Sequence, residues 1–140
     1  GPGALQGYHP TPLGDVNTLG NAATTLIPMI ETPDGVANAD AIAAVPGIDI
    51  LLIGSNDLCT AMGIPGDLKN PKLRAAYDTV ATACAAHKKI LGIGGIRGDV
   101  AQVAELVRLG ARFVIAGSDV QYLMRAARDE VASLRKAAKP

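Results

Sequence analysis

The stretch Asp49-Ile50-Leu51-Leu52-Ile53-Gly54-Ser55-Asn56-Asp57 decides the fold of this chain. Its first five residues are nearly all branched aliphatic, which is typical of a strand covered on both faces of a parallel sheet. The Gly54-Ser55-Asn56 turn then places Asp57 just beyond the strand. Loops at the carboxyl ends of parallel strands form the ligand-binding edge of α/β proteins. The stretch therefore predicts a buried parallel strand with a carboxylate at the binding edge.

A second carboxylate stands in the same context, because Glu31 directly follows a predicted strand at residues 24–30. If the two strands are neighbours, about 4.8 Å apart, Glu31 and Asp57 can both reach one cation. Mg²⁺ is typically held by one or two carboxylates, with water and substrate oxygens completing its octahedron. The alternative is that each is a solvated turn or cap carboxylate, favoured by a helix dipole.

A unit of a short apolar strand, a turn and an amphipathic helix repeats four times along the chain. The predicted strands are residues 24–30, 49–53, 89–94 and 112–116, and the predicted helices are residues 33–45, 71–87, 99–109 and 118 onward. Pro28 cannot donate a ladder hydrogen bond, so the first strand is expected at an edge or a bulge. Residues 1–23 show no apolar period and are predicted as a loop or arm, and residues 54–70 are predicted as a long loop.

Four βα units in sequence predict a parallel sheet with right-handed crossovers. A closed (β/α)₈ barrel needs eight such units and roughly 250 residues, and this chain of 140 residues supplies half of them. The predicted fold class is therefore α/β, with residues 24–140 forming a half-barrel that another copy or a complementary half closes by oligomerisation. The alternative is an open, doubly wound four-stranded domain with helices on both faces.

The last predicted helix has both a start signal and an apolar face. Ser118 with Gln121 forms a capping-box pattern. An apolar stripe follows at helical spacing, and its members are Val120, Leu123, Met124, Ala127, Val131 and Leu134. We expect this helix to contact a neighbouring chain.

The composition narrows the class of protein. Apolar residues make up 49% of the chain and charged residues 19%, which indicates a folded domain. Lys plus Arg and Asp plus Glu both number 13 and no basic stripe is visible, so neither a nucleic acid nor a membrane partner is expected. No apolar run approaches the ~20 residues that span a bilayer. Cys59 and Cys84 lie outside any CxxC pair and predict reduced thiols in a cytoplasmic protein.

At Ile27-Pro28-Met29-Ile30-Glu31-Thr32 and Ile53-Gly54-Ser55-Asn56-Asp57-Leu58 the chain resembles the HpcH/HpaI family of metal-dependent class II pyruvate aldolases, including macrophomate-synthase-like members. The resemblance runs over about residues 26–128. The Glu-Thr and Gly-x-x-Asp-Leu elements, with 26 positions from Glu31 to Asp57, make it more specific than either motif alone.

The resemblance implies a fold, a site and an activity. The matching stretch is similar to strands five to eight of a (β/α)₈ barrel. Glu31 and Asp57 correspond to the two protein ligands of Mg²⁺, Mn²⁺ or Co²⁺, and the turn Ser55, Asn56 and Asp57 corresponds to the place where backbone amides hold the pyruvate carboxylate. The implied reaction is retro-aldol cleavage of a 2-oxo acid to pyruvate and an aldehyde. Some members of the family also decarboxylate oxaloacetate.

The chain also departs from the family pattern, since the family draws its enolate-stabilising Arg and its acid/base His from the first half of the barrel. His9 falls in the predicted arm, and His87 falls at a helix end, on the predicted opposite face. Arg97 follows the third strand, but no motif matches it to the family Arg. The catalytic residues are left unassigned. A second hypothesis therefore stays open, in which the chain is an incomplete half-barrel or assembly subunit that binds metal without turnover.

Overall fold

The computed structural model describes residue 3 and residues 7–138 of the chain. Four strands form one parallel sheet in the order β1-β2-β3-β4, which confirms the predicted α/β class. The elements are α1 (Leu13–Ala23), β1 (Met29–Ile30), α2 (Pro33–Ala37), α3 (Ala39–Ala43), β2 (Ile50–Gly54), α4 (Ser55–Ala61), α5 (Pro71–Ala86), β3 (Ile90–Gly94), α6 (Val100–Leu109), β4 (Ala111–Val114) and α7 (Asp119–Ala137).

The strand β2 is central, and every one of its residues is buried, as its aliphatic sequence predicts. The strand β1 lies at the edge of the sheet, which confirms the expectation drawn from Pro28. The Pro28 carbonyl still accepts a hydrogen bond from the Leu52 N–H at 3.0 Å. Proline therefore contributes to the sheet only as an acceptor.

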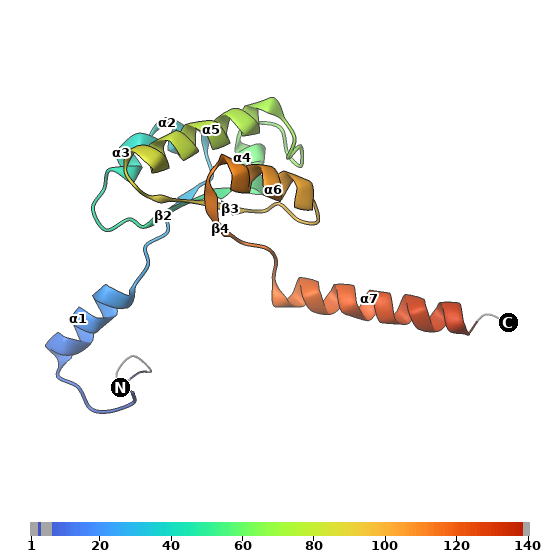
Figure 1. The fold of residues 1–140 in the computed structure, drawn as a ribbon, viewed down its shortest axis with the longest axis horizontal. Coiled ribbons are helices and arrows are strands. Elements are labelled where there is room, and N and C mark those ends of the chain that lie inside the picture. Colours follow the sequence, from blue (N-terminus) through green and yellow to red (C-terminus); the bar gives the residue numbers. More distant parts are fainter. Residues whose placement is uncertain (1–2, 4–6, 139–140) are drawn as a thin grey trace.

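The two faces of the sheet have different surroundings. Helices α2 to α6 lie along one face (Figure 1), and they bury the side chains of Leu51, Ile53 and Ile93 in the core. The opposite face carries apolar side chains that no helix of the described chain covers. The exposed fractions there are 51% for Met29, 42% for Ile90 and 43% for Ile115. This arrangement is that of a half-barrel with an open inner face.

Four expectations about the elements need correction. Residues 13–23 of the predicted arm form α1, which no apolar period marks in the sequence and none of whose residues is buried. Residues 1, 2 and 4–6 of that arm, and residues 139–140, lie outside the described residues. The predicted loop 54–70 contains α4, whose start has no side-chain cap to signal it. The predicted helix 33–45 is divided at Asn38, where the side chain donates to the Asp34 carbonyl at 2.8 Å.

The predicted strand 24–30 is also shorter than expected. Only Met29–Ile30 joins the ladder, preceded by an isolated bridge between Leu26 and Ile48. Pro28 explains this shortening, because it has no N–H to continue the pairing.

The helix α7 extends away from the body of the protein, as does α1 (Figure 1). Its capping box between Ser118 and Gln121 is present as predicted. No residue of α7 is buried, so the whole apolar stripe predicted for this helix is exposed. Among residues 7–138, no helix combines the length and apolar character that crossing a membrane requires.

Candidate active site

The Glu31 side chain lies over the end of the neighbouring strand. Ile30 of β1 pairs with Ile53 of β2, so the next residues along the two strands, Glu31 and Gly54, come side by side. A Cβ atom added to Gly54 would lie 2.7 Å from Glu31 Oε1 and 2.8 Å from its Cγ. Glycine at position 54 therefore makes the space that the half-buried Glu31 side chain occupies.

Asp57 lies at the same edge of the sheet. It is in the first turn of α4, which begins directly where β2 ends, and its side chain is exposed. Asp57 thus stands three residues beyond Gly54, against which Glu31 lies. The structure places both predicted ligands at the carboxyl ends of adjacent strands, where α/β proteins bind ligands.

The other two residues of the predicted substrate turn have different roles. Ser55 is fully buried, and its hydroxyl donates to the Gly94 carbonyl at 2.6 Å and also bonds the Tyr77 hydroxyl. The Ser55 hydroxyl is therefore used inside the protein, which leaves only its backbone as a candidate substrate contact. Asn56 is exposed, and its Nδ2 donates to the Gly95 carbonyl at 3.2 Å.

Tyr77 was not predicted from the sequence as part of this region. Burial raises the pKa of its phenol above the ordinary value, and the hydrogen bond with Ser55 acts in the opposite direction. The net direction is upward, so Tyr77 stays protonated at neutral pH and remains a hydrogen-bond donor.

The candidate acid/base residues do not join the carboxylates. His87 caps the end of α5 just before β3 begins, and its Nε2 lies 2.8 Å from Asp40 Oδ1. This position is at the amino ends of the strands, opposite Glu31, as predicted. His9 is exposed ahead of α1. Arg97 is exposed in the loop after β3, and no hydrogen bond or ion pair joins it to the described part of the chain.

The two predicted ligands at this edge, Glu31 and Asp57, are both carboxylates. Within residue 3 and residues 7–138, no group of three or more His, Cys, Asp or Glu side chains is arranged to hold a metal ion. Two carboxylates are nonetheless the usual protein share of a Mg²⁺ site, because water and substrate oxygens supply the rest. Glu31 and Asp57 therefore suit a hard divalent cation that is shared with an oxygen-rich substrate.

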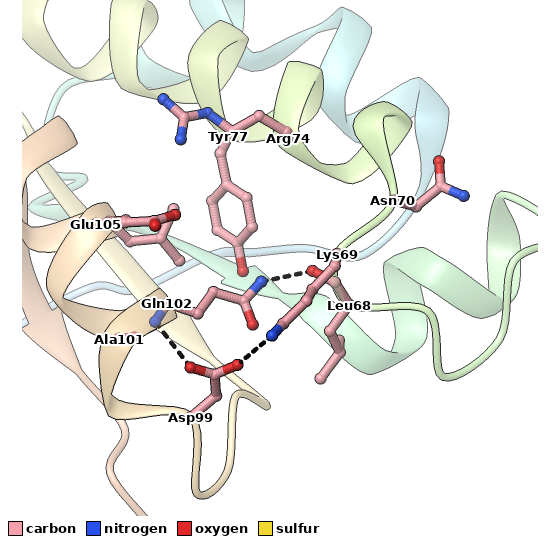
Figure 2. Close-up of a pocket in the computed structure, with 10 residues that line it drawn as sticks. Leu68, Lys69, Asn70, Arg74, Tyr77, Asp99, Ala101, Gln102 and Glu105 are labelled. Atoms are coloured by element: carbon pink, nitrogen blue, oxygen red, sulfur yellow. Dashed lines mark hydrogen bonds and ion pairs between the residues drawn. The ribbon is translucent and has the colours of Figure 1, made fainter.

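A separate pocket of about 290 Å³ lies between α5 and α6 (Figure 2). Two of its lining residues form an ion pair, with Lys69 Nζ 2.9 Å from Asp99 Oδ2, and Gln102 donates to the Leu68 carbonyl. A hydrogen bond from the Gln102 N–H, together with Lys69, lowers the pKa of Asp99. Neither Glu31 nor Asp57 lines this pocket, so it is distinct from the carboxylate edge.

Comparison with known proteins gives consistent matches. The profile of the HpcH/HpaI aldolase/citrate lyase family matches residues 7–126. A 4-hydroxy-4-methyl-2-oxoglutarate aldolase of Hapsidospora irregularis is 38% identical over 119 residues, which are 84% of this chain and 44% of that protein. A hydroxypyruvate/pyruvate aldolase of Paraburkholderia phytofirmans is 33% identical over 115 residues, 82% of this chain and 44% of that protein.

Solved structures match the fold. An HpcH/HpaI aldolase of Desulfitobacterium hafniense has a TM-score of 0.79 and 25% identity, over 95% of this chain and 50% of that one. Macrophomate synthase has a TM-score of 0.73 and 30% identity, over 94% of this chain and 44% of that one. The chain spans about half the length of the curated relatives it matches. The four βα units therefore correspond to half of a (β/α)₈ barrel.

Proposed function

Because the chain belongs to the HpcH/HpaI aldolase/citrate lyase family, we propose that it is a divalent-metal-dependent aldolase-type lyase acting on small 2-oxo acids. The reaction is retro-aldol cleavage to pyruvate and an aldehyde, with decarboxylation of oxaloacetate as a related activity. The names of its relatives, aldolases of 2-oxo acids, support this substrate class. The observation that carries the proposal is the position of Glu31 against Gly54, one strand away from Asp57.

Each residue of the site has a proposed role. Glu31 and Asp57 would hold Mg²⁺, Mn²⁺ or Co²⁺ as its two protein ligands. When bound, the cation supplies Lewis-acid stabilisation of the negative charge that develops on the carbonyl oxygen of a 2-oxo acid. The N–H groups in the first turn of α4, from Ser55 to Asp57, would bind the carboxylate of pyruvate or oxaloacetate, because amides in a first helical turn lack intrahelical acceptors.

Calorimetry with Mn²⁺ and pyruvate tests the proposal. The full chain is expected to bind Mn²⁺, and pyruvate is expected to tighten that binding, since the two would share one coordination sphere. A chain that melts cooperatively but gives no heat with Mn²⁺, in the presence or absence of pyruvate, would remove the proposal.

A second candidate function is a half-barrel that binds metal without turnover. It is favoured by the open inner face of the sheet, where Met29, Ile90 and Ile115 are exposed, and by the distance of His87 from the carboxylate edge. Assays of oxaloacetate decarboxylation and of aldol cleavage separate the two functions. Turnover by the purified chain alone supports the first, and metal binding without turnover supports the second.

We propose in addition that the chain works as a homo-oligomer or with a complementary half-barrel. The apolar inner face of the sheet and the exposed stripe of α7 are both surfaces that a second chain would cover. Four open strands leave two sheet edges and one apolar face exposed to solvent, which folded proteins usually cover or block. The stripe on α7 is the element expected to contact the neighbouring chain.

The two cysteines support a cytoplasmic location. Cys59 and Cys84 are both free and buried, and burial raises the pKa of each thiol. A raised pKa disfavours the reactive thiolate. Unpaired, reduced cysteines are typical of cytosolic proteins, so this location remains part of the proposal.

Substituting Gly54 tests the placement of Glu31 without touching a carboxylate. In Gly54→Ala, the new methyl group would meet Glu31 Oε1 and Cγ at 2.7 and 2.8 Å, so the Glu31 side chain must move. Mn²⁺ affinity is expected to fall about 10-fold, the scale seen when a supporting residue of a metal site is lost. Thermal unfolding should change little, because a surface-reaching side chain can swing aside.

Gly14→Ala is the matched control for Gly54→Ala. A Cβ at position 14 meets nothing within 4 Å, and the residue lies in α1, away from the site. Its Mn²⁺ affinity should equal that of the wild type. Equal affinities for the wild type and Gly54→Ala would show that Glu31 does not ligate from its observed position.

A further inference from the structure

We propose that Tyr77 is a positioning residue for the Asn56–Asp57 turn, acting through Ser55, which it holds at the start of α4. This proposal rests on the proposed function, which makes Asp57 a metal ligand and the backbone amides of the turn the substrate contacts. The hydrogen-bond network itself is independent of any ligand. The residues of this network, Tyr77, Ser55 and Gly94, all lie within the described part of the chain.

The direction of the network follows from counting protons. Ser55 has one hydroxyl proton, and the Gly94 carbonyl, 2.6 Å from Ser55 Oγ, can only accept. The Ser55 proton is therefore committed to Gly94, and Tyr77 must donate to Ser55 Oγ. The exposed fractions are 1% for Tyr77 and 0% for Ser55, so water does not compete for either bond. The network joins α5, the first residue of α4 and the end of β3.

A second bond ties the next residue to the same strand end. Asn56 Nδ2 donates to the Gly95 carbonyl at 3.2 Å, so residues 55 and 56 bind consecutive carbonyls at the end of β3. Gly95 has a φ of +87°, and a Cβ there would lie 2.8 Å from Asn56 Nδ2, so glycine is required at this approach. Asp57 follows directly, and no hydrogen bond or ion pair holds its side chain to the described chain. Its direction depends on how α4 begins.

The residue that supports Ser55 belongs to a long helix with a buried face. Tyr77 comes from α5, a 16-residue helix that packs on the sheet. Figure 2 shows its ring descending from α5 between Arg74 and Gln102, where it forms a wall of the pocket between α5 and α6. A functional turn is held most accurately when its supporting bonds come from such elements. Tyr77 therefore transmits the position of α5 to the edge that carries Asp57.

The substitution Tyr77→Phe removes the donor and keeps the ring. Loss of one buried hydrogen bond corresponds to a factor of about 2 to 12 in an equilibrium. We expect amide hydrogen exchange at residues 58–61, where the N–H groups of α4 have intrahelical acceptors, to accelerate about 5-fold in the metal-free chain, with exchange in α6 unchanged. The Kd for Mn²⁺ should rise by a similar factor. Tyr122→Phe makes the same chemical change on α7, away from Ser55, and should alter neither quantity.

Ser55→Ala breaks the same network from its centre, and it decides the question if Tyr77→Phe does not fold. When both variants fold, the double variant should match Ser55→Ala within about twofold in exchange and affinity, because both substitutions remove one network. If the effects of the two single substitutions instead multiply in the double variant, the two residues act independently and the proposal is overturned. Unchanged exchange at residues 58–61, or faster exchange with unaltered Mn²⁺ affinity, would also overturn it. A wild type that binds no Mn²⁺ removes the proposed function, while the exchange rates still decide whether Tyr77 holds α4.

Discussion

Glu31→Gln and Asp57→Asn are each expected to weaken Mn²⁺ binding by at least about 100-fold, because loss of even an outer-shell partner costs a metal site about 10- to 100-fold. Glu31 and Asp57 are the two protein ligands that we propose for the cation, and each contributes one negative charge. Replacing either by an amide removes half of the negative charge that offsets the cation. The amide keeps the shape of the side chain, so a loss of Mn²⁺ affinity would reflect the missing charge and ligand rather than altered packing.

Matched amide variants elsewhere supply the controls. Glu105→Gln lies on α6 beside the α5/α6 pocket, and Asp129→Asn lies on α7. Both change the net charge by the same amount, and both should bind Mn²⁺ as the wild type does. Calorimetry and the relaxation of water protons by bound Mn²⁺ measure the affinities independently. If an amide at position 31 or 57 left the affinity within a few-fold of the wild type, the cation would have to bind elsewhere.

The helices and strands that were predicted correctly are marked by residues within them or directly beside them in the sequence. The helix predicted at residues 71–87 is α5, whose start is set by neighbouring residues. The Asn70 side chain accepts from the Lys72 N–H, and Pro71 occupies the first turn. The strand β2 follows from an unbroken aliphatic run. Such features need no knowledge of the rest of the chain, so a single sequence reveals them.

The parts that were not predicted lack such signals. The helix α4 begins straight after β2 with glycine as its N-cap and no capping side chain, so nothing distinguishes it from a loop. The sequence of α1 shows no apolar period that would have marked it as a helix, and the structure buries none of its residues. Neither helix could therefore be predicted from a capping residue or an apolar period in its own sequence.

The candidate site divides in the same way. The positions of Glu31 and Asp57 follow from strand ends and parallel order, which the sequence indicates. The hydrogen bond between Ser55 and Tyr77 joins residues that are 22 positions apart and lie on different helices. No short sequence motif predicts such a contact. The role of Gly54 becomes visible only once the register is known, because it depends on Ile30 pairing with Ile53. Supporting residues of a site are therefore harder to predict than its charged groups.

The substitution Val131→Asp on α7 is expected to weaken association between chains by on the order of 100-fold, because burying an unpaired carboxylate in an apolar contact costs several kcal/mol. Val131 belongs to the exposed apolar stripe, and no part of the described chain buries it. A charge there costs little in a single chain. Its effect should therefore appear in the oligomeric state and hardly at all in the helix content.

Ser133→Asp is the control that separates the stripe from a general effect of charge. Position 133 lies two residues along the same helix, about 200° around its axis at 3.6 residues per turn, and so on the face away from the stripe. Sedimentation velocity should show the same assembly for the wild type and Ser133→Asp, and a smaller species for Val131→Asp. A wild type that sediments as a monomer at every concentration would refute the assembly proposal. If both variants dissociated, α7 would contribute through its total charge rather than through its apolar face.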